Sequence, residues 1–318
     1  MSRRMMIFAG TSNPELATQI VDQIEGVELG AVKIQRFANG EIYVRFLESV
    51  RGADVFLIQS TCTPVNETLI ELLIMVDAAK RASAAHICVV MPHYGYGRQD
   101  KKSASREPIT ARLVADMLEV AGVDRIITMD LHQGQIQGFF SIPVNHLTAL
   151  GILADHFSSL GLSDMCVVSP DVGRAKVCKK LADMLDAPLA IMHKGRPEHN
   201  RAEITSVVGH VDGMNCIVTD DMIDTAGSIT EGAKALIAQG AKGVWVGATH
   251  GIFSPPAYER IAASPIEGLV VTNTIPVAPE HQSDKLKVLS VAPMFAAAIK
   301  NVYNDASISE LFDPDFQF

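Results

Sequence analysis

Tryptophan, cysteine and positive charge are all scarce in this 318-residue chain. There is one Trp, and the five Cys residues form no C-x-x-C pair. An odd cysteine count without paired spacing argues against a disulfide framework or a zinc site and is typical of a reducing compartment. The 27 Lys and Arg residues face 36 Asp and Glu, for a net charge of −9. We therefore expect no general nucleic-acid partner, because such proteins need a basic field to recruit phosphates.

Long apolar runs are also lacking. The most apolar stretch, Leu69–Ala79, is interrupted by Glu71 and Asp77, so nothing approaches the ~18 residues of a membrane span. The N-terminus carries a short apolar run after Arg3 and Arg4 but no cleavage pattern of a signal peptide. We expect a cytoplasmic protein with no membrane partner.

The composition that remains is that of a folded globular protein, with 48% hydrophobic and 20% charged residues. At roughly 150 residues per domain, the length suits two domains. Short apolar runs typical of strands recur at Met5–Phe8, Val55–Ile58, Ile87–Met91, Ile126–Met129, Met165–Val168, Leu189–Met192, Cys216–Val218, Val244–Val246 and Leu269–Val271. Segments with helical spacing lie between them, among them Glu67–Arg81, Thr110–Ala121, Ala175–Leu185 and Ile229–Gln239. The alternation predicts an α/β fold with mostly parallel sheets flanked by helices.

The two halves of the chain show a weak similarity in the order of their elements. Gly52–Ile58, a loop, a helix and a strand that leads to His93 resemble the order of elements from Gly213 to His250. This pattern indicates an internal duplication, and two unrelated strand-helix-strand units are the alternative. No Gly/Ser-rich linker is present, so we place the boundary near 146–148. The expected domains are 1–147 and 148–304, with a tail, 305–318, that could pack on the first.

The most informative segment is Val218–Ser228, where an apolar strand ends in Asp220 and Asp221 and a loop of small residues opens a helix. Unpaired N–H groups and the positive dipole end at a helix N-terminus favour a phosphate, and Thr225 and Ser228 add hydroxyl donors. Ionised carboxylates accept hydrogen bonds from the vicinal hydroxyls of a sugar. The segment therefore predicts a sugar-phosphate site.

A simpler interpretation is that Asp224 only caps the helix and that the acidic pair is a solvated strand end. The segment nevertheless resembles the ribose-phosphate motif of type I phosphoribosyltransferases, in which two acids precede a D-T-x-G-[ST] loop. A second cluster, Tyr96–Arg106, contains four cations and almost no apolar side chain, which indicates an exposed basic loop. Such a loop suits a polyphosphate, although a charge run is often only a solvated surface.

Taken together, the motifs resemble those of ribose-phosphate pyrophosphokinases over essentially the whole chain. Four elements carry the resemblance, namely Phe37–Glu41, Gly97–Lys102, Thr128–His132 with Gln135–Phe140, and Asp220–Ser228. The family implies two phosphoribosyltransferase-like halves, synthesis of phosphoribosyl pyrophosphate and AMP from ATP and ribose 5-phosphate, a Mg²⁺ cofactor and a homohexamer built from dimers. Inorganic phosphate is a possible activator.

The resemblance also implies roles for individual residues. Phe37, Asn39 and Glu41 are expected to contact adenine in a neighbouring subunit's site, and Arg98 and Gln99 to meet the nucleotide and its phosphates. The ribose 5-phosphate site is expected to comprise Arg196, Asp220, Asp221, Asp224, Thr225, Ala226, Gly227 and Ser228. By residue type alone, Phe37 would be assigned to a core.

Magnesium is expected at His132 and Asp171, although this metal prefers oxygen ligands and a lone histidine is more often structural. Lys194 and Arg196 match the catalytic residues of the family's lid, where ordinary surface charge is the alternative. Diphosphoryl transfer would proceed without a covalent enzyme intermediate, by alignment and charge neutralisation.

A regulatory phosphate or ADP pocket is implied at Ser49, Arg51, Lys102, Ser105, Arg106, Ser307 and Ser309, and Gly134 and His146 lie in a stretch that often contributes to it. The chain departs from the family pattern at Arg174, Gly195 and Pro255–Pro256. Two rival functions share some of these features. A phosphoribosyltransferase would not need Phe37–Glu41 or the basic loop, and a non-catalytic regulatory homologue would tolerate losses at Lys194, Arg196 or Asp224, all of which are present.

Overall fold

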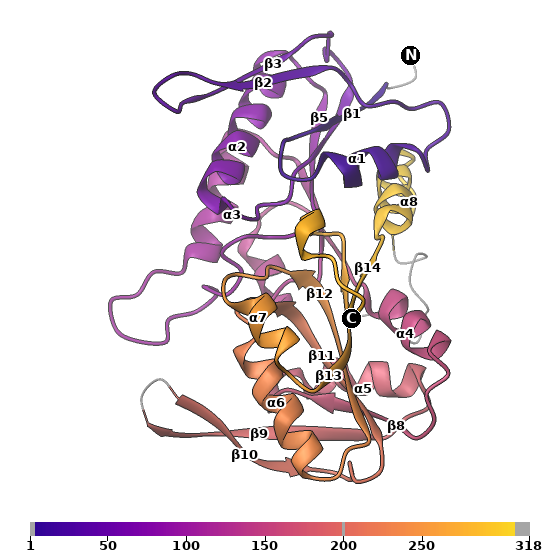
Figure 1. Cartoon of the computed structure of the whole chain (residues 1–318). Coiled ribbons are helices and arrows are strands. Elements are labelled where there is room, and N and C mark those ends of the chain that lie inside the picture. Colours follow the sequence, from indigo (N-terminus) through magenta and orange to yellow (C-terminus); the bar gives the residue numbers. More distant parts are fainter. Residues whose placement is uncertain (1–3, 199–200, 309–318) are drawn as a thin grey trace. The chain divides into compact units, whose positions relative to one another are not determined.

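The structure, a computed structural model, describes residues 4–198 and 201–308, and for 194–198 and 201–205 it describes the backbone only. The chain divides into two compact units (Figure 1). Unit 1 contains the chain up to Thr148, the segment Thr274–Pro276 and the chain from Ser290 onward, and unit 2 contains Ala149–Asn273 and Val277–Leu289. Each unit has its own mostly parallel sheet with helices, which confirms the predicted α/β class.

The sheet of unit 1 is parallel throughout and has the strand order β1-β4-β5-β6-β7. Its strands are β1 (Met5–Ala9), β4 (Asp54–Ile58), β5 (His86–Met91), β6 (Arg125–Met129) and β7 (Val144–Leu147). All five residues of β4 are buried, as is typical of a strand covered on both faces. The four apolar runs expected in this half thus form β1, β4, β5 and β6.

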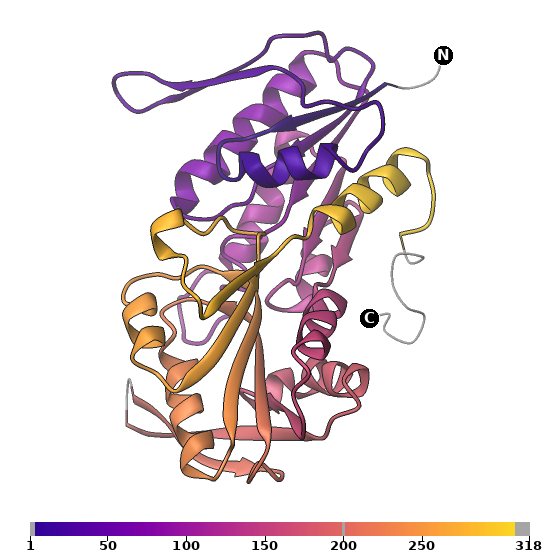
Figure 2. The ribbon, with the colours of Figure 1, turned by 45° about the vertical axis from the view of Figure 1, so that its right-hand side comes forward.

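Helices cover the unit 1 sheet in two pairs (Figures 1 and 2). They are α1 (Pro14–Val21) packed with α8 (Ala292–Tyr303), and α2 (Val65–Arg81) packed with α3 (Thr110–Ala121); a short 3₁₀ helix, η1 (Gly134–Phe139), follows β6. Phe8, Phe56 and Leu72 are fully buried beneath them. Burial of each such side chain contributes roughly 1.5–3 kcal/mol, so the core holds the strand ends and their loops in place.

A separate antiparallel hairpin, β2 (Val32–Arg36) and β3 (Ile42–Phe46), packs on α2. Its turn is closed by hydrogen bonds from the Phe37 N–H to the Glu41 carbonyl at 2.8 Å and from the Gly40 N–H to the Phe37 carbonyl at 2.9 Å. Gly40 adopts a φ of 90°, which a residue without a Cβ accommodates easily. An ion pair between Arg36 and Glu67 links the hairpin to α2.

The sheet of unit 2 has the strand order β10-β9-β8-β11-β12-β13-β14. All neighbours pair in parallel except β9 and β10, which form a hairpin. The strands are β8 (Met165–Ser169), β9 (Leu189–Glu198), β10 (Arg201–Val208), β11 (Asn215–Ile223), β12 (Gly243–Gly251), β13 (Ile266–Thr272) and β14 (Leu286–Leu289). The order in which the chain adds strands reverses between the neighbours β8 and β11. From β8 the chain adds β9 and β10 toward one edge of the sheet, and from β11 it adds β12, β13 and β14 toward the other edge.

The helices of unit 2 are α4 (Leu150–Ser159), α5 (Ala175–Met184), α6 (Gly227–Ala238) and α7 (Ala257–Ala262); the 3₁₀ helices are η2 (Val172–Arg174) and η3 (Pro279–His281). Among the described residues, no helix is long and apolar enough to cross a membrane.

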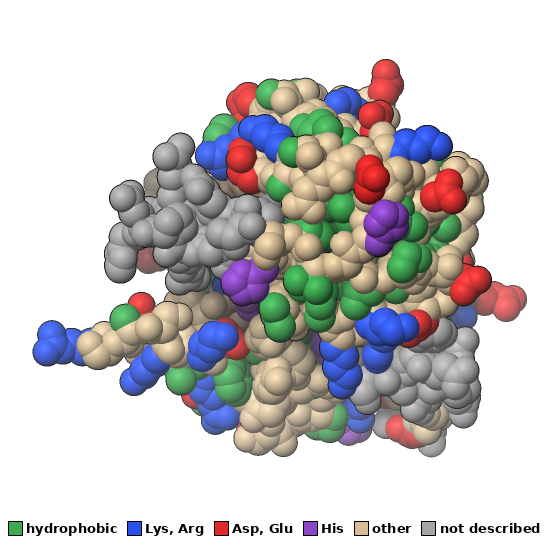
Figure 3. Space-filling view, turned by 90° about the horizontal axis from the view of Figure 1, so that it is seen from below, with side chains coloured by type: hydrophobic (Ala, Val, Ile, Leu, Met, Phe, Trp, Pro, Cys, Tyr) green, Lys and Arg blue, Asp and Glu red, His purple; other side chains and the backbone are tan. Residues whose placement is uncertain are grey.

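All five cysteines are buried and free, in agreement with the expected absence of a disulfide framework. One face of the molecule carries Lys and Arg interspersed with Asp and Glu (Figure 3).

Candidate functional site

The acidic pair of unit 2 lies at the reversal of its sheet. β8 pairs with β11 only as far as Val168 opposite Val218, so Asp220 and Asp221 extend past the carboxyl end of β8. In open α/β sheets, ligands bind outside the carboxyl ends of the strands at such a reversal, because the connections there diverge and leave a crevice. The topology and the predicted sugar site therefore coincide.

Asp171 follows β8 at the same edge and organises the start of the next helix. Its Oδ1 accepts a hydrogen bond from the Arg174 N–H at 3.0 Å, and its own carbonyl accepts one from the Ser169 hydroxyl at 2.6 Å. The capped turn η2 leads directly into α5. This geometry fixes the backbone of Arg174 next to the ends of β8 and β11.

The side chain of Arg174 contacts both members of the acidic pair. Its Nε lies 3.4 Å from Oδ1 of Asp220, and its Nη1 lies 3.4 Å from Oδ1 of Asp221. The Asp221 side chain is almost completely buried, and that of Arg174 is only 19% exposed. The sequence marked Arg174 as a departure from a family pattern but did not reveal this contact.

The two carboxylates perturb each other. Burial, followed by the negative charge of Asp221, raises the pKa of Asp220 to about 7, while the Arg174 guanidinium acts in the opposite direction. The Asp221 N–H donates to Oδ1 of Asp220 at 2.9 Å. The ionisation of Asp220 therefore responds to any additional charge brought close to it.

The loop that follows β11 presents hydroxyl and N–H donors. Ala226 is the N-cap residue of α6, with a φ of 59°, and its methyl side chain makes no capping hydrogen bond. Thr225 and Ser228 are exposed, while Asp224 is partly buried. The N–H groups of the first turn of α6 and the two hydroxyls are donors of the kind that suits an anion.

Arg260 on α7 supports this loop from behind. Its Nη1 donates to the Thr225 carbonyl at 2.9 Å and lies 3.3 Å from where a Cβ on Gly227 would stand. A side chain at position 227 would thus press on the guanidinium that holds the loop. Sequence reasoning missed Arg260, because a contact across 35 residues leaves no local pattern.

Lys194 and Arg196 lie on β9 of the β9–β10 hairpin, with Lys194 opposite Ile204. Their side chains are outside the described part of the structure, as is Ser309 of the expected regulatory pocket. Their roles stay predictions.

The expected adenine contacts lie on the turn of the β2–β3 hairpin. Phe37 is 51% exposed and its ring meets that of Tyr43 edge-on at 5.8 Å, so the assignment of Phe37 to a core is wrong. Asn39 accepts a hydrogen bond from the Glu41 N–H at 3.2 Å, and both side chains are exposed. The turn therefore offers one aromatic face and two polar groups to a ligand.

Arg98 and Gln99 follow β5 and are both exposed. The Gln99 N–H donates to the Tyr96 carbonyl at 2.9 Å, and the Gln99 carbonyl accepts from the Ala111 N–H at 3.2 Å, which ties the loop to α3. Residues 101–106 of the predicted basic loop are exposed as well, including Lys102, Ser105 and Arg106. Glu107 orders it by accepting the N–H groups of residues 103 and 104 at 2.7 and 2.8 Å.

His132 is partly buried after β6, in a loop held by its neighbours. Nε2 of His146 accepts the Leu131 N–H at 2.9 Å, and the Thr148 hydroxyl donates to Oδ1 of Asp130 at 2.8 Å. His146, expected near a regulatory pocket, thus supports the loop that carries His132. No group of three His, Cys, Asp or Glu residues with the spacing of a metal site occurs among the described residues.

Asp171, the other residue expected at the magnesium site, lies in unit 2 at the carboxyl end of β8. Asp171 supplies a carboxylate there, so by donor chemistry it fits this metal better than a histidine does, whereas Asp220 and Asp221 face Arg174. The remaining described members of the expected regulatory pocket lie in unit 1: Ser49 and Arg51 precede β4, and Ser307 follows α8. The Ser307 carbonyl accepts a hydrogen bond from the Asn301 amide at 2.7 Å.

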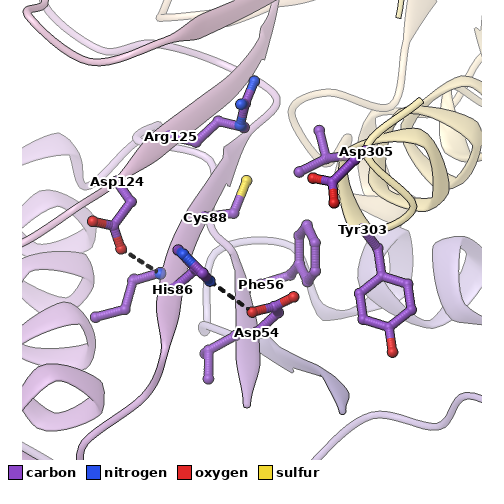
Figure 4. Close-up of a pocket in the computed structure, with 11 residues that line it drawn as sticks. Asp54, Phe56, His86, Cys88, Asp124, Arg125, Tyr303 and Asp305 are labelled. Atoms are coloured by element: carbon purple, nitrogen blue, oxygen red, sulfur yellow. Dashed lines mark hydrogen bonds and ion pairs between the residues drawn. The ribbon is translucent and has the colours of Figure 1, made fainter. Parts of the chain in front are cut away.

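A cavity of about 180 Å³ with a mixed polar and apolar lining lies at the amino ends of the unit 1 strands, where β4, β5 and β6 begin (Figure 4). His86 Nδ1 lies 2.9 Å from Oδ1 of Asp54, and Asp124 accepts the Ile87 N–H at 2.8 Å. The cavity is also lined by Phe56, Arg125, Tyr303 and Asp305. Because it lies at the amino ends of the strands, it is separate from the loops that carry Arg98 and His132.

Comparisons with known proteins agree with this geometry. Residues 5–122 match the N-terminal domain of ribose phosphate pyrophosphokinase, and residues 196–313 match the phosphoribosyl synthetase-associated domain. Ribose-phosphate pyrophosphokinases from Bacillus caldolyticus and Clostridium tetani are 54% and 52% identical to this chain, and each alignment covers 98% of both chains. A crystal structure of phosphoribosylpyrophosphate synthetase from Mycobacterium smegmatis superposes with a TM-score of 0.90 at 46% identity, over 96% of this chain and 100% of that one.

Full-length similarity of this kind defines the chain as an enzyme of the diphosphotransferase class. It belongs to the ribose-phosphate pyrophosphokinase family, as the sequence motifs predicted.

Proposed function

We propose that the chain transfers the β,γ-diphosphoryl group of ATP to the anomeric hydroxyl of ribose 5-phosphate, forming phosphoribosyl pyrophosphate and AMP in the cytoplasm. One observation carries the proposal for this chain. The acidic pair at the reversal of the unit 2 sheet lies next to the start of α6, whose N-cap residue is an alanine and whose first residues are flanked by exposed hydroxyls. Carboxylates for sugar hydroxyls and N–H donors for a phosphate are thereby combined in one unit.

In this proposal, ribose 5-phosphate binds with its phosphate on the loop Asp224–Ser228 and its hydroxyls toward Asp220 and Asp221. The first turn of α6 and the hydroxyls of Thr225 and Ser228 hold the phosphate oxygens. Arg260 stabilises the loop by its bond to the Thr225 carbonyl and does not need to touch the substrate. The sugar is then held at both ends, which limits its orientation.

ATP is proposed to bind through residues of unit 1. The exposed ring of Phe37 stacks on adenine, Asn39 and Glu41 hydrogen-bond to the base, and Arg98 and Gln99 contact the phosphates. An exposed aromatic residue on a hairpin turn suits a site that is completed by a second copy of the chain. We therefore propose a homo-oligomer, with a hexamer as the form implied by the family.

Magnesium would be held through Asp171 and, at the nucleotide, near His132, and it would neutralise charge on the triphosphate. Inorganic phosphate or ADP would bind as a regulator at Ser49, Arg51, Lys102, Ser105, Arg106, Ser307 and Ser309.

The reaction then needs alignment more than covalent chemistry. The anomeric oxygen attacks the β-phosphorus, the bond between the α,β-bridging oxygen and that phosphorus breaks, and AMP leaves with the bridging oxygen. Lys194 and Arg196 neutralise the charge that develops on the transferred group and on the leaving oxygen. Donors placed for this developing charge act on the transition state more than on the bound substrates.

An assay with ATP and ribose 5-phosphate tests the proposal. We expect AMP and phosphoribosyl pyrophosphate to form one for one. A phosphoribosyltransferase would consume phosphoribosyl pyrophosphate instead, and a regulatory homologue would form neither product.

A further inference from the structure

The guanidinium of Arg174 bridges the two carboxylates of the candidate sugar site. It reaches Oδ1 of Asp220 with Nε and Oδ1 of Asp221 with Nη1, at 3.4 Å in both cases. Its backbone is fixed independently, because the Arg174 N–H is bound by Asp171. The cation is therefore built into the site and is not a flexible surface charge.

The charge balance gives this contact a consequence for binding. Two adjacent carboxylates repel each other and also repel ribose 5-phosphate, whose own phosphate is anionic. The Arg174 guanidinium, held at the pair, cancels part of both repulsions. Because this side chain is mostly buried, water screens its charge only weakly. The exposed Lys176, two residues further along α5, cannot replace it in this position.

We propose that Arg174 is a resident counter-cation of the sugar site: it holds Asp220 and Asp221 side by side and lets the site accept anionic ribose 5-phosphate without a divalent cation at this pair. The inference rests on the proposed function, because it takes ribose 5-phosphate as the ligand. Arg174 acts through the two carboxylates and is a positioning residue.

Calorimetric titration of the full-length protein with ribose 5-phosphate, in EDTA and in millimolar Mg²⁺, tests the proposal. In EDTA, Arg174→Met should raise the dissociation constant about tenfold, because the acidic pair loses its counter-cation. Magnesium supplies positive charge and should therefore reduce the ratio of the two dissociation constants to less than about threefold. The dissociation constant of Arg174→Lys should stay within about threefold of that of the unmodified chain in both conditions. The matched control, Lys176→Met, removes the same charge from the exposed face of α5 and should change neither constant.

Equal affinity of Arg174→Met and the unmodified chain in EDTA would overturn the inference. The inference would also be overturned if Arg174→Met melts at the same temperature as the unmodified chain but binds ribose 5-phosphate more weakly to the same extent with and without Mg²⁺. If Arg174→Met does not fold, Arg174→Gln is titrated in the same way, with the same outcomes. An unmodified chain that binds ribose 5-phosphate only with Mg²⁺ contradicts the inference alone, whereas one that binds it in neither condition contradicts the proposed function itself.

Discussion

At the scale of single residues, Asp220 links the site to pH. Its raised pKa means that the folded protein binds the proton more tightly than the unfolded chain does. The stability that this group contributes is therefore fully present below about pH 4 and is lost as the pH rises through about 7.

Asp220→Asn provides the test, since the amide resembles the protonated acid and does not titrate. Without divalent cations, the free energy of unfolding of the unmodified chain should fall relative to the variant between pH 4 and 7, by up to about 4 kcal/mol. Urea unfolding at several pH values measures the difference. A difference independent of pH would show that Asp220 ionises normally in the folded protein.

Lys194 on β9 allows a second test at this scale. If its charge acts mainly on the transition state, Lys194→Ala should lower kcat about a hundredfold to a thousandfold with modest changes in KM. Steady-state kinetics with each substrate varied measures both constants. Lys234→Ala, which removes an exposed lysine paired with Glu231 on α6, is the control. A near-normal kcat for Lys194→Ala would reduce this residue to ordinary surface charge.

At the scale of elements, the loop between β11 and α6 is the part of the site that the sequence described best. Its small residues and hydroxyls are contiguous, so the pattern is visible in one short window, and in the structure Thr225 and Ser228 are exposed at the start of α6. Arg174 and Arg260 reach the same region from elements distant in the sequence. Their contacts depend on how strands and helices pack, which no local pattern encodes.

The same reasoning explains which elements were predicted. Strands such as β4 and β5 consist of a buried apolar run after one polar residue, and such runs are visible in the sequence. The β2–β3 hairpin was missed because most of its residues are only partly buried or exposed and its turn was interpreted as a binding motif. β14 is short and half-buried, which leaves too weak a pattern for prediction.

Asp224 tests the loop as an element. Asp224→Ala should raise the KM for ribose 5-phosphate more than the KM for ATP, because this residue lies in the loop that is proposed to hold the sugar phosphate. Kinetics with one substrate varied at saturating levels of the other would separate the two constants. An increase confined to the ATP KM would contradict the assignment of the loop.

At the scale of the whole molecule, the proposal requires more than one chain at each adenine site. Phe37→Ala and Arg196→Ala damage different parts of the machinery, so neither variant alone should be active. When the two are dissociated, mixed and reassembled, some sites should inherit an intact hairpin from one chain and an intact β9 from the other, and part of the activity should return.

Mass spectrometry of the mixture verifies that subunits exchange, and each variant reassembled alone is the control. Exchange without recovered activity, or a fully active isolated monomer, would show that one chain builds the adenine pocket by itself.

The central claim is that the anomeric oxygen of ribose 5-phosphate attacks phosphorus, and the fate of that oxygen tests it most directly. The chain is supplied with ATP and ribose 5-phosphate labelled with ¹⁸O at the anomeric hydroxyl, and both products are analysed by mass spectrometry. The account predicts that the label is retained in phosphoribosyl pyrophosphate, between C1 and the diphosphate, and that AMP is unlabelled. Loss of the label from the sugar product, or labelled AMP, would contradict it.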